Sequence, residues 1–222
     1  MYIPEHFKEV SKGVIVRKEI NNPQTIDIQA HYENDAINIL VSDNCHYSGL
    51  YSHILNVMPE LSNAYYDVVS IGGGNPKFEV AILKAVDITV LDGFADSYKA
   101  KDTQFRQIFN ISEDVNIDYR KCDLSSPFSP TIPLNSCVSF VHFLEHCDSW
   151  ETVKAWIKDQ ESDIVIYGPN IEVAQDADWF HFRPKDHNVF FTIEAIAAYA
   201  KEIGYTVESI AYSDDMLIWL RN

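Results

Sequence analysis

The second part of the chain alternates short apolar segments with longer segments of helical period. From Tyr65 to the C-terminus, runs of β-branched and aromatic residues are separated by stretches in which apolar residues recur every three or four positions. That alternation is typical of a parallel sheet with crossover helices. We therefore expect an α/β fold with a doubly wound, seven-stranded, mostly parallel sheet. The strands that the pattern predicts are Asp67–Ile71, Asp87–Leu91, Asn116–Lys121, Cys137–Val141, Asp163–Tyr167, Tyr205–Ile210 and Met216–Leu220.

Three segments between these strands have the spacing of amphipathic helices. Lys77–Ala85 is expected to be the first crossover helix, and Ser149–Lys158 a later one. The clearest is Thr192–Ile203, where Thr192 can cap the first turn and Gly204 can end the helix in a left-handed conformation. The apolar stripes of these helices are expected to face the core.

The first 64 residues have a different pattern. Gly13–Ile20 and Thr25–Ala30 flank a polar turn and are predicted to pair as a hairpin, and Ser48–Met58 has helical spacing. We expect residues 1–64 to form a short N-terminal α/β cap, and residues 65–222 to form the main domain.

The composition limits the partners of the protein. A chain of 222 residues suffices for one large domain with a short extension, and 46% hydrophobic with 23% charged residues is an ordinary globular mixture. The formal net charge is −16, and the sequence contains no basic cluster to offset it. Such a charge repels nucleic-acid phosphates and anionic lipid headgroups. We therefore expect neither duplex nucleic acid nor a membrane as a partner.

The cysteines and the N-terminus indicate the compartment. The four cysteines form no CxxC pair, so neither a zinc ribbon nor a redox dithiol is indicated. The first residues are acidic and polar where a secretory signal needs an apolar stretch, and no apolar run approaches the roughly 18 residues of a membrane span. We expect a cytoplasmic protein.

A glycine cluster, Gly72 to Gly74, separates the predicted strand Asp67–Ile71 from the helix that follows. An open α/β sheet binds ligands at such a junction, because the carboxyl end of the strand faces the amino end of the helix. The next strand ends at Asp92, whose carboxylate can accept hydrogen bonds from two ribose hydroxyls. Asp123 follows the third strand and can accept from an exocyclic amine such as that of adenine. These two carboxylates favour a nucleoside ligand.

With these motifs, residues 65–222 resemble the class I S-adenosylmethionine-dependent methyltransferases. Ser70–Pro76 resembles the glycine-rich first motif of that family, Leu91–Phe94 its acidic second motif, and Cys122–Leu124 its adenine-binding turn. Three further segments resemble elements of the family. Cys137–Cys147 is similar to its fourth strand and the following turn, Ile164–Asn170 to its fifth strand, and His187–Thr192 to the entry to the next helix.

The resemblance implies a cofactor and a set of residues that bind it. The cofactor would be S-adenosylmethionine, with S-adenosylhomocysteine as product, and residues 65–222 would be the domain that binds it. The residues implied in cofactor binding are Gly72, Gly73, Gly74, Asp92, Gly93, Phe94, Asp123, Leu124 and His142.

The first motif departs from the family pattern at two positions. Ser70 stands where the family has an acidic residue that helps to hold the ammonium end of the methionine, and Pro76 stands where it has a third glycine. Proline is well accepted in the first turn of a helix, where its missing N–H is not needed. A nicotinamide dehydrogenase is not indicated, because Lys77 stands where the GxGxxG fingerprint has its last glycine.

His142, Glu145 and His146 stand at i, i+3 and i+4, so they share one face if this turn is helical. The HxxEH spacing is that of inverzincin proteases, but those carry it inside a long helix and not directly after an apolar strand. The ubiquinone-type O-methyltransferase branch of the resembling family has a similar ExxEH segment that can hold a divalent ion. Its match here is Glu145 and His146, with His142 replacing the first glutamate. A divalent metal on this pair is left open and not expected, and the pair could equally brace the loop.

A loop rich in aromatic residues, Asp176–His187, follows the fifth predicted strand. In doubly wound sheets this loop lies over the ligand edge, although loop aromatics also serve as packing anchors. His146 and His181 are the expected catalytic bases, because imidazole accepts a proton at neutral pH. The loop residues expected to line an acceptor pocket are Trp179, Phe180, His181 and Arg183.

Together these features predict an enzyme that transfers a methyl group to an oxygen, or as second choice a nitrogen, of a small-molecule acceptor. The sequence has neither the (D/N)PP(Y/F/W) motif of DNA adenine methyltransferases after the fourth strand nor a Pro-Cys pair for a cytosine methyltransferase. One alternative is a catalytically inactive methyltransferase-like scaffold subunit, which Ser70 and Pro76 would support. A less favoured one is a zinc hydrolase that uses His142, Glu145 and His146. The sequence predicts neither the acceptor nor the oligomeric state.

Overall fold

The apolar segments of the second part of the chain form strands in the computed structural model, which describes residues 1–18, 44–131, 133, 135–182 and 186–222. Each predicted strand is present, with ends that differ from the prediction by at most two residues. They are β3 (Asp67–Ile71), β4 (Asp87–Asp92), β5 (Asn116–Lys121), β6 (Ser136–Val141), β7 (Asp163–Pro169), β9 (Thr206–Tyr212) and β10 (Asp215–Arg221).

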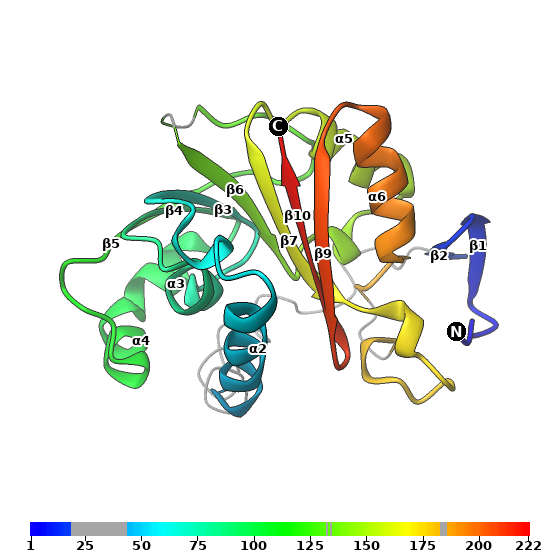
Figure 1. Ribbon diagram of the computed structural model, residues 1–222, viewed down its shortest axis with the longest axis horizontal. Coiled ribbons are helices and arrows are strands. Elements are labelled where there is room, and N and C mark those ends of the chain that lie inside the picture. The colour runs from blue at the N-terminus through cyan, green and yellow to red at the C-terminus, as the bar shows by residue number, and fades with distance from the viewer. Residues whose placement is uncertain (19–43, 132, 134, 183–185) are drawn as a thin grey trace. The chain divides into compact units, whose positions relative to one another are not determined.

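These strands form one sheet in the order β5-β4-β3-β6-β7-β10-β9 (Figure 1). β3 pairs in parallel with both β4 and β6, and β4 pairs in parallel with β5. β10 is antiparallel to β7 and β9. The order is not the order along the chain, as crossover connections require. The prediction of a doubly wound, mostly parallel, seven-stranded sheet is confirmed.

The elements group into two units. One unit contains β3, β4, β5 and the first residues of β6, together with α2 (Asn44–Val57), α3 (Ala95–Ala100) and α4 (Asp102–Phe109). The other contains β7, β9 and β10, with α5 (Trp150–Lys158) and α6 (Ile193–Glu202), and three short strands: β1 (Phe7–Ser11), β2 (Val14–Arg17) and β8 (Val189–Phe191). The domain boundary predicted at residue 64 stays a prediction.

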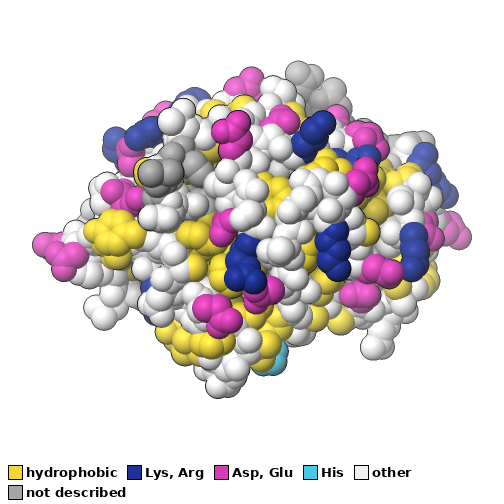
Figure 2. Space-filling view, turned by 45° about the horizontal axis from the view of Figure 1, so that its top comes forward, with side chains coloured by type: hydrophobic (Ala, Val, Ile, Leu, Met, Phe, Trp, Pro, Cys, Tyr) yellow, Lys and Arg dark blue, Asp and Glu magenta, His cyan; other side chains and the backbone are white. Residues whose placement is uncertain are grey.

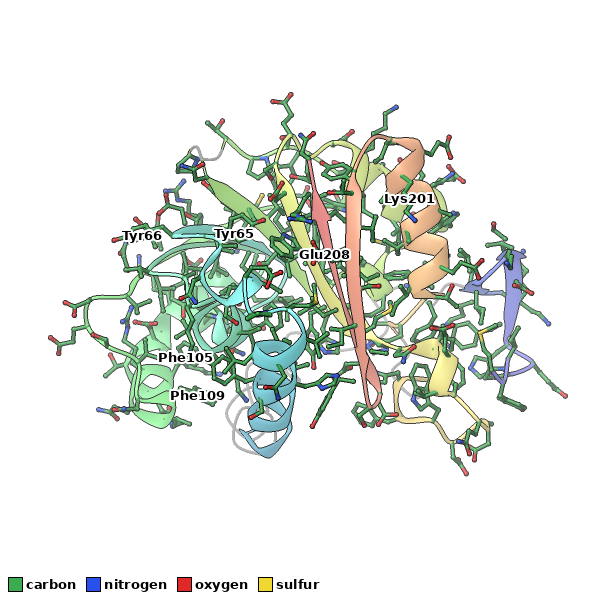
Figure 3. All side chains as sticks on the ribbon, in the orientation of Figure 1. Tyr65, Tyr66, Phe105, Phe109, Lys201 and Glu208 are labelled. Atoms are coloured by element: carbon green, nitrogen blue, oxygen red, sulfur yellow. The ribbon has the colours of Figure 1, made fainter. Side chains whose placement is uncertain are left out.

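The predicted helices Ser149–Lys158 and Thr192–Ile203 are present as α5 and α6, and capping residues mark their first turns. Ser149 and Thr192 cap α5 and α6 by accepting a hydrogen bond from the N–H three residues later, and Gly204 is left-handed (φ 102°) after α6. The predicted helix Lys77–Ala85 is shorter than expected. It is wound as a π-helix over Glu79–Leu83, because the left-handed Lys84 (φ 58°) ends it. The sequence reading did not predict α3 and α4. On α4, Phe105 and Phe109 lie one turn apart with ring centroids 5.2 Å from each other (Figure 3).

The N-terminal hairpin differs from the prediction. β2 pairs with β1 on one side and with β8 on the other, so the order of the small sheet is β1-β2-β8. Both edges of β2 are therefore occupied, and the predicted partner Thr25–Ala30 lies outside the described residues. The physical reason is Gly13, whose positive φ (73°) makes a tighter turn directly before β2. Each strand of this small sheet contributes one residue, Phe7, Ile15 and Phe190, to a hydrophobic cluster that also contains Ile171, Ala174, Trp179 and Phe182.

One face of the molecule shows how charged side chains are distributed. On the face drawn in Figure 2, acidic and basic side chains are interspersed with apolar ones. Among the described residues, no helix combines the length and the apolarity that crossing a bilayer requires.

Gly13 offers a test of the hairpin. A Cβ at this position would overlap with the Thr192 side chain and would also adopt a strained backbone conformation. We expect Gly13→Ala to lower the free energy of unfolding by more than 1 kcal/mol, on the order of the cost of a left-handed non-glycine residue plus steric displacement. Gly204→Ala is the matched control, because Gly204 also has positive φ but a Cβ there meets nothing within 4 Å. Urea unfolding that shows equal losses for the two variants would contradict the assigned contact.

Candidate functional site

The glycine turn follows β3 directly and is tied to the end of β4. Gly72 and Gly74 both adopt the left-handed conformation (φ 67° and 66°), which glycine enters at little cost. The Gly72 N–H donates to the Leu91 carbonyl oxygen at 2.9 Å. A Cβ on Gly74 would overlap with the phenol ring of Tyr98, which adds to the preference of the positive φ for glycine.

Asp92 is the central acceptor of this edge. Its side chain is 5% exposed, and its Oδ1 accepts the Phe94 N–H at 2.6 Å. Burial raises the pKa of Asp92, and hydrogen bonds from the backbone N–H groups of Phe94 and Gly74 act in the opposite direction. The carboxyl group therefore joins the glycine turn to the turn after β4.

The turn after β5 lies beside Asp92. The Cys122 N–H donates to the Asp92 carbonyl oxygen at 3.1 Å, and a Cβ on Gly93 would lie 3.8 Å from the Cys122 carbonyl oxygen. Asp123 is exposed and Leu124 is half-buried. The structure thus brings Gly72, Gly73, Gly74, Asp92, Gly93, Phe94, Asp123 and Leu124 to the carboxyl ends of three neighbouring parallel strands, and their part in ligand binding stays a prediction.

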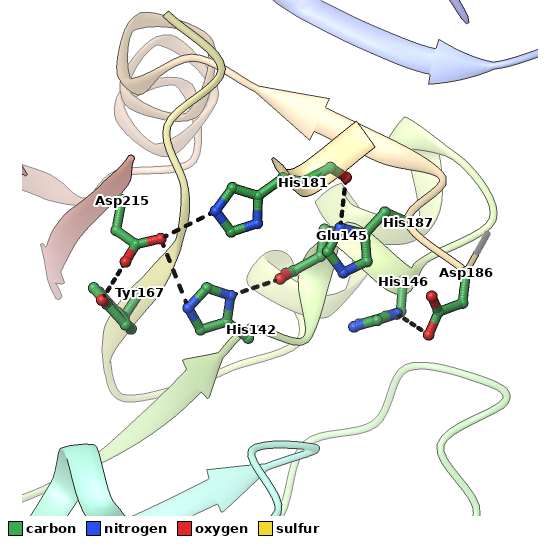
Figure 4. A network of polar contacts seen from close by, with 8 residues as sticks. All are labelled: His142, Glu145, His146, Tyr167, His181, Asp186, His187 and Asp215. Carbon is green, nitrogen blue, oxygen red and sulfur yellow. Dashed lines mark hydrogen bonds and ion pairs between the residues drawn. The ribbon is translucent and has the colours of Figure 1, made fainter. Parts of the chain in front are cut away.

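His142 belongs to a cluster of histidines and carboxylates (Figure 4). It follows β6 in a left-handed conformation (φ 48°), which costs a non-glycine residue about 1–3 kcal/mol and is common at functional sites. Its N–H donates to the Tyr167 carbonyl oxygen at 2.8 Å, and its Nδ1 lies 3.0 Å from Glu145 Oε1. Only Leu144–His146 are helical in this turn, so the long helix of an inverzincin motif is not formed.

Three side chains of the cluster could hold a metal ion. Glu145, His146 and His187 each place one ligand atom so that the three atoms lie within 4.8 Å of one another. Asp186 orients one of them, because its Oδ2 lies 3.2 Å from His146 Nδ1. The Asn188 N–H donates to the Glu145 carbonyl oxygen at 2.7 Å, which fixes the turn of Glu145 against the segment of His187.

The protonation states suit two of these three residues, Glu145 and His187, to metal binding. Burial alone would raise the pKa of Glu145, but the hydrogen bond and charge of His142, with His146 and His187, lower it to about 2. Burial lowers the pKa of His187 to about 4, so its ring is neutral at pH 7 and can donate a nitrogen lone pair. Burial would also lower the pKa of His146, but Asp186 and Glu145 outweigh it and raise the pKa.

A second group in the cluster surrounds Asp215 at the start of β10. Its Oδ1 lies 3.6 Å from His181 Nε2 and 3.8 Å from His142 Nε2, and Tyr167 donates to its Oδ2 at 2.5 Å. Burial and the charge of His142 lower the pKa of His181. His181 Nδ1 has no hydrogen-bond partner in the part of the chain that the structure describes. His181 is thus a buried, neutral imidazole beside a carboxyl group.

The loop residues proposed for an acceptor pocket have different surroundings. Trp179 packs in the hydrophobic cluster against Phe182 and Phe190, and its Nε1 donates to Asp214 at 3.2 Å. It is therefore a packing anchor. Phe180 is 66% exposed, and Arg183 lies outside the described residues.

Sequence reasoning missed four members of the cluster: Tyr167, Asp186, His187 and Asp215. Asp186 and His187 stand in the same loop as His181. A carboxylate and an imidazole so close to it in the sequence could have been predicted to belong to the same site. Nothing in the sequence indicates Asp215, because β10 reaches this place only through its antiparallel pairing with β7.

Similarity to known proteins lies in the fold. No protein-family model and no curated protein matches the sequence. Among solved structures, the DhpI–SAM–HEP complex is similar with a TM-score of 0.57 and 14% identity, covering 91% of this chain and 100% of that one.

Two larger proteins are similar as well. An O-methyltransferase family protein from Burkholderia thailandensis has a TM-score of 0.61 and 12% identity, covering 89% of this chain and 61% of that one. NcsB1, an O-methyltransferase from neocarzinostatin biosynthesis crystallised with S-adenosyl-L-homocysteine and 1,4-dihydroxy-2-naphthoic acid, has a TM-score of 0.52 and 13% identity, covering 84% and 60%. The chain thus spans about three fifths of these two proteins. At such identities the likeness establishes the fold, which is the Rossmann-like fold of class I methyltransferases.

Proposed function

We propose that this protein is an S-adenosylmethionine-dependent methyltransferase that acts on a small molecule and releases S-adenosylhomocysteine. The observation that carries the proposal is Asp92, a buried carboxyl group at the end of β4 that accepts a backbone N–H of the glycine turn. A carboxylate held in this way can accept both hydroxyls of a ribose. The fold and the ligands of DhpI and NcsB1 support the cofactor.

The acceptor is proposed to be a hydroxyl group, with an amine as second choice. The net charge of −16 disfavours a nucleic-acid duplex. NcsB1, of similar fold, was crystallised with a dihydroxynaphthoic acid, which supports a small hydroxylated acceptor. A cytoplasmic location is also proposed, supported by the free thiols of Cys122, Cys137 and Cys147.

The chemistry asks little of the protein beyond alignment and proton removal. S-adenosylmethionine supplies an already activated methyl group, so the chain must bind it, position the acceptor and take one proton. His181 suits the last task better than His146. Its lowered pKa keeps the ring neutral at pH 7, whereas Asp186 favours the protonated ring of His146.

A divalent metal fits the cluster as an additional component. Glu145, His146 and His187 supply one carboxylate and two imidazoles, a donor set that suits zinc, iron, cobalt or manganese. A metal bound there would lower the pKa of a hydroxyl group that binds to it. One nitrogen of His146 cannot both bind a metal and accept a proton. With a metal bound there, His181 is therefore again the proposed base that removes the proton of the acceptor.

Asp92→Asn tests the cofactor edge. The asparagine keeps an oxygen for the Phe94 N–H but loses the charge, so we expect the affinity for S-adenosylhomocysteine to fall by about tenfold or more, as measured by calorimetry. Asp87→Asn is the matched control, because Asp87 begins the same strand and accepts from Asn116 at 2.9 Å. Equal affinity in the Asp92 variant would contradict the proposal. Absence of binding by the folded wild type would favour the scaffold alternative.

His187→Ala tests the metal set. We expect the metal-stripped wild type to bind one Co²⁺ with a visible absorption spectrum, and both His187→Ala and Glu145→Gln to lose at least ten-fold in affinity. His53→Ala, a substitution on α2, serves as the control and should leave binding unchanged. A wild type that binds no Co²⁺, or a His187 variant that binds as tightly, would show that the three residues only brace the turn.

His181→Gln tests the base, once a panel of hydroxylated and amine acceptors has identified one that turns over. We expect kcat to fall by about 10²–10⁴-fold with little change in the KM for the acceptor. Because the pKa of His181 in the free protein lies below 6.5, kcat/KM of the wild type should rise with pH and level off by pH 7. A rise centred above pH 6.5, with the larger loss in His146→Gln, would assign the proton to His146 instead.

A further inference from the structure

Glu79 is a fully buried carboxyl group in the unit that holds the glycine turn. It begins the π-helix Glu79–Leu83, and its side chain has an exposed fraction of 0%. Its Oε1 accepts the hydroxyl of Ser139 on β6 at 2.7 Å. π-helical turns are rare and occur frequently at functional sites. The role proposed above for the glycine turn does not use this side chain.

Two oxygen atoms of this group, Glu79 Oε2 and Ser70 Oγ, make no hydrogen bond of normal length and angle within the described residues. Ser70 is itself fully buried, and it is the register partner of Ser139 in the β3–β6 pair. Burial raises the pKa of Glu79, and hydrogen bonding by the hydroxyls of Ser139 and Ser70 acts in the opposite direction. Leaving buried polar atoms unpaired is costly, so this place calls for a hydrogen-bond donor.

The group lies next to the proposed cofactor edge. Ser70 is two residues before Gly72, where β3 is about to enter the glycine turn, and Glu79 follows the same turn. The Nζ of Lys77, also in this segment, lies 4.7 Å from the centre of the Phe109 ring. A carboxyl group with one unpaired oxygen is a natural partner for an ammonium group.

We propose that Glu79, with Ser70, receives the α-ammonium group of the cofactor, either directly or across one bridging water. This inference rests on the proposed function and adds the residue that holds the amino-acid end of the ligand. It also accounts for Ser70, which stands where the resembling family carries an acid. In this chain the carboxyl group comes from the helix after the glycine turn, and the strand contributes a hydroxyl beside it.

The test compares two ligands that differ at the amino-acid end. S-adenosylhomocysteine carries the α-ammonium group, whereas 5′-methylthioadenosine lacks the whole amino-acid part and keeps the nucleoside. We expect Glu79→Gln, which is nearly isosteric, to weaken S-adenosylhomocysteine by about tenfold or more in calorimetry and to leave methylthioadenosine within about twofold. Ser139→Ala removes a hydrogen bond to the same carboxyl group but keeps its charge, so it should preserve the ratio of the two affinities.

A relocation of the carboxylate completes the test. Glu79→Gln combined with Ser70→Asp returns an acid to the strand, and we expect it to recover most of the lost affinity for S-adenosylhomocysteine. Equal losses for both ligands in Glu79→Gln, or no loss for either, would overturn the inference while leaving the cofactor site of the wild type standing. A folded wild type that binds neither ligand would overturn this inference together with the proposed function.

Discussion

The parallel pairing of β3 with β4 is the constraint on which the candidate cofactor edge depends. It brings Gly72 beside Leu91 and lets the Asp92 carboxyl group accept a backbone N–H from Gly74. Because the two strands run in the same direction, their last residues meet at one edge, and the glycine turn and the acidic side chain arrive there together. A shift of one residue would turn Asp92 to the other face of the sheet. The proposed ribose acceptor therefore rests on strand register.

Within the other unit, the histidine cluster depends on a segment that is fixed from two sides. The Arg17 side chain on β2 donates to the His187 carbonyl oxygen at 3.0 Å, and the Arg17 N–H donates to the Asn188 carbonyl oxygen. On its other side, Asn188 donates to the Glu145 carbonyl oxygen. The short N-terminal hairpin thus supports the residues that could hold a metal. Rigid support of this kind is what a positioned donor set requires.

Sequence patterns predicted most of the regular structure, and missed the helices α3 and α4 and the parts that depend on long-range pairing. The strands and α5 and α6 follow from apolar period and capping residues, which are local signals. The π-helical winding at Glu79 has no local signal of that kind. β1 and β8 are short strands whose partner is β2, distant from β8 in the sequence. Of the site, Asp92 could be predicted from a strand end, whereas Asp215 enters the cluster only through the pairing of β10 with β7.

The most direct measurement of the central claim is a crystal structure of the protein with S-adenosylhomocysteine. The account predicts density for the ligand along Gly72–Gly74, with both ribose hydroxyls on the Asp92 carboxylate and the α-ammonium group next to Glu79 and Ser70. Ligand density elsewhere in the molecule, with the Asp92 side chain still bonded only to backbone N–H groups, would contradict it.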